Sequence, residues 1–287
     1  MKSILVLTDF SENAQCASAL GLALSKKLRT NLLLFNSFSA YPIMASYAGG
    51  PWVVDEFIIK QSHSKKQLSL LAENLEDIAN QYNDLERTPS ISCLCGEGDV
   101  GSNVADIIEQ KDIELVVMGA RADKSDNHIL FGRDTSSVIR KATRPVLAIP
   151  SKFDFDGLNK VVFATDFNKE DITAIKYLIK LGKLFNYQLD IIHVNELGKG
   201  KSINSDQVIL FKEQVTKLKY PGISYHEVWG KDIVERLNGL CNETGAGILA
   251  LTHHQYPFLI RILQKSTAKK ALADQKIPLM IFPSSFK

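Results

Sequence analysis

Long apolar runs are absent from this 287-residue sequence. None approaches the ~20 residues that a membrane-spanning helix needs, so we expect no membrane partner. The first residues, MKSILVLTDFSENA, lack a long apolar region followed by a small-residue cleavage site, so we expect no signal peptide. With 45% hydrophobic and 23% charged residues, the composition is typical of a globular protein rather than a disordered one.

Cysteine is scarce, with four residues in the whole chain, which do not form the disulfide framework of a secreted domain. A reducing, cytoplasmic environment therefore fits best. Cys93 and Cys95 lie two apart in SCLCG and would share one face of a strand. Further ligands at suitable spacing are not visible, so no metal is assignable. We expect both thiols to be buried, as free cysteines usually are.

Charge of one sign is also lacking, because the formal net charge is only +2. Residues 1–150 carry 15 Lys and Arg against 18 Asp and Glu, and residues 151–287 carry 19 against 14. This excess has no Arg-rich cluster and no interleaved aromatic residues. The sequence therefore predicts a solvated surface and no nucleic-acid partner.

Catalytic motifs are missing as well. The chain has no Gly-x-Ser-x-Gly, HExxH or CxxC motif and no Gly-Lys-Ser/Thr ending of a phosphate-binding P-loop. An ATPase would need a magnesium ligand and a residue that orients water, and neither can be assigned. We therefore predict binding without turnover, with no catalytic residues.

An internal repeat is the strongest positive feature. ILVLTDF at 4–10 recurs as VVFATDF at 161–167, an offset of 157 residues. ELVVMGAR at 114–121 falls on GILALTHH at 247–254, an offset of 133. The difference of 24 residues places an insertion in the middle of the first copy. The sequence thus predicts two copies of one domain, residues 1–150 and 157–287.

Each copy alternates short apolar strands with helical segments. This pattern is typical of an open parallel sheet covered on both faces, an α/β fold. In the first copy, one long helix should bury a stripe formed by Leu68, Leu71, Leu75 and Ile78. Right-handed crossovers would leave a crevice at the carboxyl ends of the central strands.

A polar loop, residues 119–133, follows the fourth strand of the first copy and is bracketed by Gly119 and Gly132. Glycine allows backbone N–H groups to approach phosphate oxygens closely. A helix that starts after Gly132 would favour an anion at its N-terminus. From the residues alone, the loop is either a phosphate cradle or the turn between a strand and a helix.

Together these segments resemble the universal stress protein family in its tandem two-domain form. The openings ILVLTDFS and VVFATDFN, the VVMG strand end, the glycine-bracketed loop and the endings RPVLAIP and IPLMIFP carry the resemblance. It implies two Rossmann-like domains, each a five-stranded parallel sheet of order 3-2-1-4-5 with helices on both faces. ATP-binding members of the family carry a Gly-x-x-Gly-x9-Gly-Ser/Thr motif between strand four and the last helix.

The first copy keeps the spacing of this motif but only part of its residues. Gly119 and Gly132 match the first and third glycines, while Ala122 replaces the second and Arg133 replaces the Ser or Thr. The added Cβ at Ala122 would cost about 1 kcal/mol in a left-handed conformation. The second copy has Thr252, Gln255 and Lys265 at the three glycine positions and keeps only Ser266.

The resemblance implies a stress-response protein that binds ATP or AMP in the first copy. The base and ribose would lie between Asp9 and the strand end at Met118 and Gly119. The phosphates would meet backbone N–H groups near Gly132, with Arg133 supplying charge. The implied nucleotide-binding residues are Thr8, Asp9, Met118, Gly119, Ala122, Gly132, Arg133 and Asp134.

Two other classes of function stay open. One is a protein-interaction module that has lost its ligand, as in the branch of the family without the glycine motif. The other is an enzyme such as the nucleotidyl transferases, which share a similar layout. The family also implies that the fifth strands, PVLAIP and PLMIFP, pair so that domain 1 packs on domain 2 as a pseudo-dimer. A homodimer of the whole chain is compatible with the sequence but not specified by it.

Overall fold

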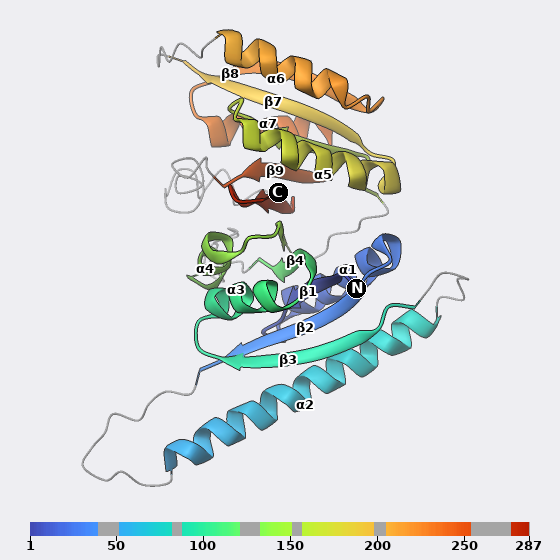
Figure 1. Cartoon of the computed structure of the whole chain (residues 1–287), viewed down its shortest axis with the longest axis vertical. Coiled ribbons are helices and arrows are strands. Elements are labelled where there is room, and N and C mark those ends of the chain that lie inside the picture. The colour runs from blue at the N-terminus through green and yellow to red at the C-terminus, as the bar shows by residue number, and fades with distance from the viewer. Residues whose placement is uncertain are drawn as a thin grey trace, which may run out of the picture. The chain divides into compact units, whose positions relative to one another are not determined.

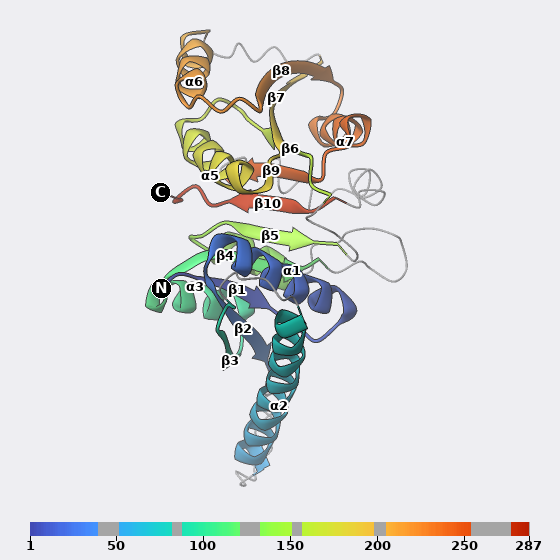
Figure 2. The ribbon, with the colours of Figure 1, turned by 90° about the vertical axis from the view of Figure 1, so that its right-hand side faces the viewer.

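A computed structural model describes residues 1–39, 52–81, 88–120, 133–150, 157–197, 205–253 and 277–286 (Figures 1 and 2). The chain divides into two compact units, with the division inside a strand between Val146 and Leu147. Residues 151–156, between the two predicted copies, lie outside the described residues. No helix in these described ranges is long and apolar enough to cross a membrane.

The first half of the chain forms a parallel sheet of order β3-β2-β1-β4-β5. Its elements are β1 (Ser3–Leu7), α1 (Glu12–Leu28), β2 (Asn31–Phe38), α2 (Trp52–Gln81), β3 (Ile91–Glu97), α3 (Val100–Gln110), β4 (Ile113–Gly119), α4 (Arg133–Lys141) and β5 (Val146–Ile149). Helices α1 and α2 lie on one face of this sheet and α3 lies on the other (Figure 2).

The second half repeats this arrangement in the order β8-β7-β6-β9-β10, with parallel pairing between all neighbours. Its elements are β6 (Lys160–Ala164), α5 (Lys169–Phe185), β7 (Gln188–Glu196), α6 (Ser205–Lys217), β8 (Ile223–Gly230), α7 (Ile233–Thr244), β9 (Ile248–Thr252) and β10 (Leu279–Phe282). Numbered within each half, both orders are 3-2-1-4-5. The predicted α/β fold, with the strand order 3-2-1-4-5 in each half, is therefore confirmed.

The repeat extends to unusual backbone conformations. Phe10 and Phe167, 157 positions apart, have φ of 63° and 67°, in the left-handed region that non-glycine residues rarely adopt. Arg29 and Asn186, at the same offset, end α1 and α5 with φ of 54° and 57°. The two halves thus share their turns as well as their strands.

Helix α2 packs on β2 and β3 through the stripe that the sequence predicts. Leu68 and Leu75 are buried, while Leu71 and Ile78 are partly buried. The helix has 30 residues, whereas its counterpart α6 has 13. The extra length of the first copy therefore includes part of this helix.

The prediction that both thiols of SCLCG are buried is wrong for Cys93. The Cys93 side chain is exposed and Cys95 is partly buried. Both lie on β3, the outermost strand of the first sheet, on which α2 packs. Cys93 Sγ lies 3.5 Å from the carbonyl oxygen of Leu68 in α2. An edge strand provides fewer neighbours than the central strands do, and this explains the difference.

Glycine allows α3 to approach α4 closely. A Cβ on Gly101 would lie 2.6 Å from the carbonyl carbon and oxygen of Ser137. We expect Gly101→Ala to lower the free energy of unfolding by about 1–3 kcal/mol, because backbone atoms must move apart. Gly239→Ala in α7, where the nearest atom is 3.7 Å away, is the matched control and should raise stability by up to about 1 kcal/mol through helix propensity. Urea unfolding followed by circular dichroism measures the stability of both variants. An equal gain in stability for the two variants would contradict the close approach of α3 to α4.

Candidate functional site

The carboxyl end of β1 is a tight turn held by Thr8. The Thr8 hydroxyl accepts a hydrogen bond of 3.0 Å from the N–H of Phe10, and the Thr8 N–H donates to the carbonyl of Phe35 in β2. Asn36 Nδ2 donates to the Thr8 carbonyl at 2.7 Å. Thr8 itself is buried. Its side chain therefore shapes the turn that presents the next residue.

Asp9 is exposed at this turn. Its Oδ1 accepts hydrogen bonds from the Ser11 N–H at 3.1 Å and from the Ser11 hydroxyl at 2.5 Å. Ser11 in turn caps α1, because its Oγ accepts from the N–H of Ala14. One carboxylate oxygen of Asp9 thus organises the start of α1, and the group remains accessible at the edge of the sheet.

The carboxyl end of β4 lies next to that of β1, since Leu7 pairs with Met118 in the parallel register. Gly119 follows, and a Cβ there would lie 2.7 Å from the carbonyl carbon of Asn13 and 2.9 Å from the nitrogen of Ala14. The glycine at the first motif position is therefore required by packing against the first turn of α1. Any ligand chemistry at Gly119 comes in addition to that requirement.

Helix α4, which follows the motif loop, is anchored to α3 by Asp99. This residue caps α3 through the Ser102 N–H at 2.8 Å and accepts from Ser137 Oγ and from Lys141 Nζ, both at 2.9 Å. The Lys141 ammonium, with these further donors, holds the pKa of Asp99 well below its usual range. Asp134 is exposed in the first turn of α4. Asp99 thus holds α4 in place at Ser137 and Lys141, away from the N-terminus of the helix.

The structure brings four predicted site residues to one edge: Thr8, Asp9, Met118 and Gly119. Ala122 and Gly132 lie outside the described residues, and only the backbone of Arg133 is described. The predicted positions of these three residues therefore stay predictions. Among the described residues, no group of three or more His, Cys, Asp or Glu side chains could hold a metal ion.

In the second half, the corresponding edge is filled by a buried hydrogen-bond network. Asp171, in the first turn of α5, is fully buried. Its Oδ2 accepts from the Thr165 hydroxyl at 2.7 Å, and its Oδ1 accepts from the Thr252 hydroxyl at 2.6 Å. The network therefore joins the ends of β6 and β9 to α5.

Comparison with known proteins identifies the family. The profile of the universal stress protein family matches residues 1–150. The chain belongs to the universal stress protein family. It is 25% identical over 160 residues to universal stress protein MJ0577 of Methanocaldococcus jannaschii, covering 53% of this chain and 96% of that protein.

Solved universal stress proteins share the fold along almost the whole chain. A structure from Archaeoglobus fulgidus is 19% identical, covers 98% of this chain and 96% of its own, and has a TM-score of 0.67. A putative universal stress protein from Pseudomonas aeruginosa is 15% identical, covers 98% and 92%, and has a TM-score of 0.60. The architecture of both halves is therefore that of this family.

Within the universal stress protein fold, the two copies differ at paired positions. Asp171 falls on Ala14 at the offset of 157, and Thr252 falls on Gly119 at the offset of 133. The first copy thus has two small residues where the second has a carboxylate and a hydroxyl in contact. The second copy supplies its own polar groups at the strand ends.

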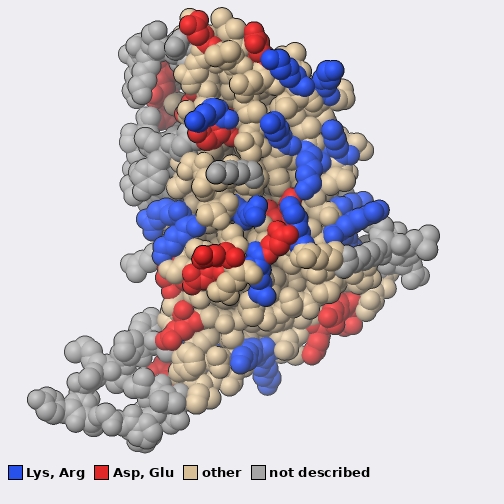
Figure 3. Space-filling model, in the orientation of Figure 1, with Lys and Arg blue, Asp and Glu red and all other residues tan. Residues whose placement is uncertain are grey.

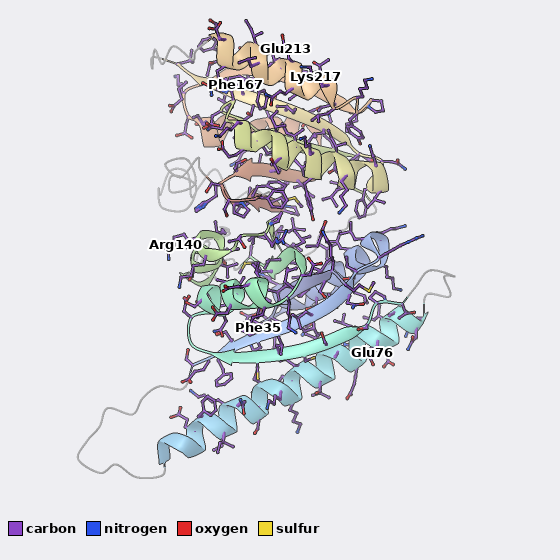
Figure 4. The ribbon with its side chains drawn as sticks, viewed as in Figure 1. Phe35, Glu76, Arg140, Phe167, Glu213 and Lys217 are labelled. Carbon is purple, nitrogen blue, oxygen red and sulfur yellow. The ribbon has the colours of Figure 1, made fainter. Side chains whose placement is uncertain are left out.

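Aromatic side chains fill the neighbouring part of the second copy. Phe167 is buried, with its ring centroid 4.4 Å from that of His193 and 5.5 Å from that of Phe211 in α6. Figure 4 labels Phe167 close to α6. Gln207 of α6 also donates to the Phe167 carbonyl at 3.0 Å. Phe10, its counterpart in the first copy, is only partly buried.

Sequence reasoning missed Asp171. The available signal was a pair of changes between the copies, Ala14 to Asp171 and Gly119 to Thr252, each readable from the repeat offsets. Recognising the pair required knowing that β4 and β9 end beside the first turns of α1 and α5. Asp166, the counterpart of Asp9 at the offset of 157, accepts from Asn168 Nδ2 at 2.6 Å.

We expect Asp171→Ala to lower the free energy of unfolding by about 2–3 kcal/mol, because two buried threonine hydroxyls lose their acceptor. Asp166→Ala, an exposed aspartate of the same unit, is the control and should change it by less than about 1 kcal/mol. Chemical denaturation of the intact chain measures both. Equal losses from the two variants would mean that the buried network contributes nothing particular to stability.

Proposed function

We propose that this universal stress protein binds an adenine nucleotide, ATP or AMP, in its first copy and does not turn it over. The observation that carries the proposal is the asymmetry of the two strand edges. At the first edge the paired positions are Ala14 and Gly119, whereas at the second they are Asp171 and Thr252, which bond to each other. The second copy places a bonded carboxylate and hydroxyl at its edge and the first copy does not, so the first is the candidate for a ligand.

The motif spacing supports the same choice. Gly119 and Gly132 stand where ATP-binding members of the family have their first and third glycines, and the second copy has lost both. In this proposal the base and ribose lie between Asp9 and the β4 end. The accessible carboxylate of Asp9 then accepts a hydrogen bond from a ribose hydroxyl.

The phosphates would lie beside the start of α4, where backbone N–H groups and the helix dipole favour an anion. Asp99 ties that helix to α3 through Ser137 and Lys141. Arg133 would supply a fork of donors in place of the hydroxyl found in the motif. We place the protein in the cytoplasm, where adenine nucleotides are abundant and its four thiols stay reduced.

Isothermal titration calorimetry of the full chain with ATP and with AMP tests the proposal. We expect a stoichiometry of one nucleotide per chain. Gly132→Val should abolish the heat signal, because a branched side chain prevents close approach of backbone N–H groups to phosphate. Lys265→Val, at the equivalent position of the second copy, is the matched control and should leave binding unchanged.

A wild-type chain that gives no heat at millimolar nucleotide would contradict nucleotide binding. It would favour the protein-interaction module, in which the departures at Ala122 and Arg133 mark a lost ligand. Loss of binding in the Lys265→Val variant would mean that the nucleotide site lies in the second copy and not in the first. Release of ADP or phosphate during the titration would contradict the absence of turnover.

A further inference from the structure

Helix α2 has an outer face that carries both apolar and charged residues. Its inner face packs on β2 and β3 through Leu68 and Leu75. On the opposite side, residues recur every three or four positions, as one helical stripe does. We call this stripe the outer face of α2: Ile59, His63, Lys66, Leu70, Glu73 and Asp77. Ile59 is 65% exposed and Leu70 is 51% exposed.

The charges on the outer face are segregated along the helix. Lys66 lies midway, beside Lys65, whereas Glu73 and Asp77 lie nearer the C-terminal end. Figure 3 shows a positive patch at the middle of α2 and an acidic patch farther towards its C-terminus. Within the part of the chain that the structure describes, neither Lys66 nor Glu73 forms an ion pair. These charges are thus available to another molecule.

The spacing of the charges makes the outer face complementary to itself. Lys66 precedes Leu70 by four residues and Glu73 follows it by three, so the two charges flank Leu70 at about one turn on each side. If two such helices cross antiparallel at Leu70, Lys66 meets Glu73 of the partner subunit, twice by symmetry. A parallel crossing would instead set like charges against each other.

We propose that the outer face of α2 is a dimerisation surface, on which α2 of a second copy of this chain packs antiparallel with Leu70 near the twofold axis. The same surface serves both subunits, as an isologous interface requires. His63 then lies opposite Asp77 of the partner subunit, which extends the charge pairing outward. This pairing of α2 helices does not depend on nucleotide binding.

The length of α2 suits this role. A helix of 30 residues spans about 45 Å at 1.5 Å per residue, long enough to align several turns with a partner. The corresponding helix α6 has 13 residues. The surface therefore belongs to the first copy, in which the chain is longer.

Sedimentation velocity of the full chain over a concentration series tests the proposal. We expect a reversible dimer with a dissociation constant on the order of 10 µM, since the face holds few apolar residues and exposed ion pairs contribute little. Lys66→Glu should weaken association about tenfold or more, because each of two symmetric contacts becomes repulsive. Added salt should weaken the wild-type dimer by screening.

A double variant that swaps the two charges is the most direct control. Lys66→Glu combined with Glu73→Lys restores opposite charges across the axis and should return association to within about threefold of wild type. Leu70→Asp should abolish it, while Leu184→Asp, at a leucine of α5 that is 44% exposed, should not. A monomeric wild-type chain at 100 µM, or a dimer indifferent to Lys66→Glu, would overturn the proposal.

Discussion

The approach of a strand end to the first turn of a helix is the constraint on which both halves of this protein depend. In the first half, β4 comes so close to α1 that a Cβ at Gly119 would lie 2.7 Å from the backbone of Asn13. In the second half, the same junction holds a threonine, whose hydroxyl bonds to Asp171. At Gly119 the lack of a side chain permits the close approach, whereas at Thr252 a hydrogen bond to Asp171 joins the strand end to the helix. Protein atoms close the junction in both halves, and the halves differ in the bonded carboxylate and hydroxyl that only the second half carries there.

A second shared element is the turn after the first strand of each half. Thr8 and Thr165 each accept from the N–H two residues on, and the Phe at that place is left-handed in both halves. Such a conformation costs about 1–2 kcal/mol for a residue with a Cβ. Because the turn persists in the second half, where the edge is filled, it belongs to the frame of the domain and does not require a bound nucleotide. At this turn, differences between the halves therefore arise from side chains set on a common backbone.

Much of this fold could be predicted from the sequence because most strands and helices occur in both copies, so each assignment in one copy could be checked in the other. Short apolar runs alternating with helical stripes specify parallel strands and crossovers, and the offsets of 157 and 133 align both sheets. The roles of Gly119 and Asp171 could not be predicted. Each role depends on a contact between a strand end and a helix turn distant in sequence, 81 residues apart for Asp171 and Thr252. The exposure of Cys93 was missed because the prediction rested on the usual burial of free cysteines and not on the edge position of the third strand.

Hydrogen–deuterium exchange of the full chain, with and without AMP or ATP, tests the central claim most directly, because it reads both edges in one experiment. The account predicts slower exchange on nucleotide addition in the turn at 8–11 and in the segment after Met118. It predicts no change in the turn at 165–168 or at the end of β9, where Asp171 and Thr252 already occupy the edge. Protection confined to the second half, or shared equally by both halves, would contradict it.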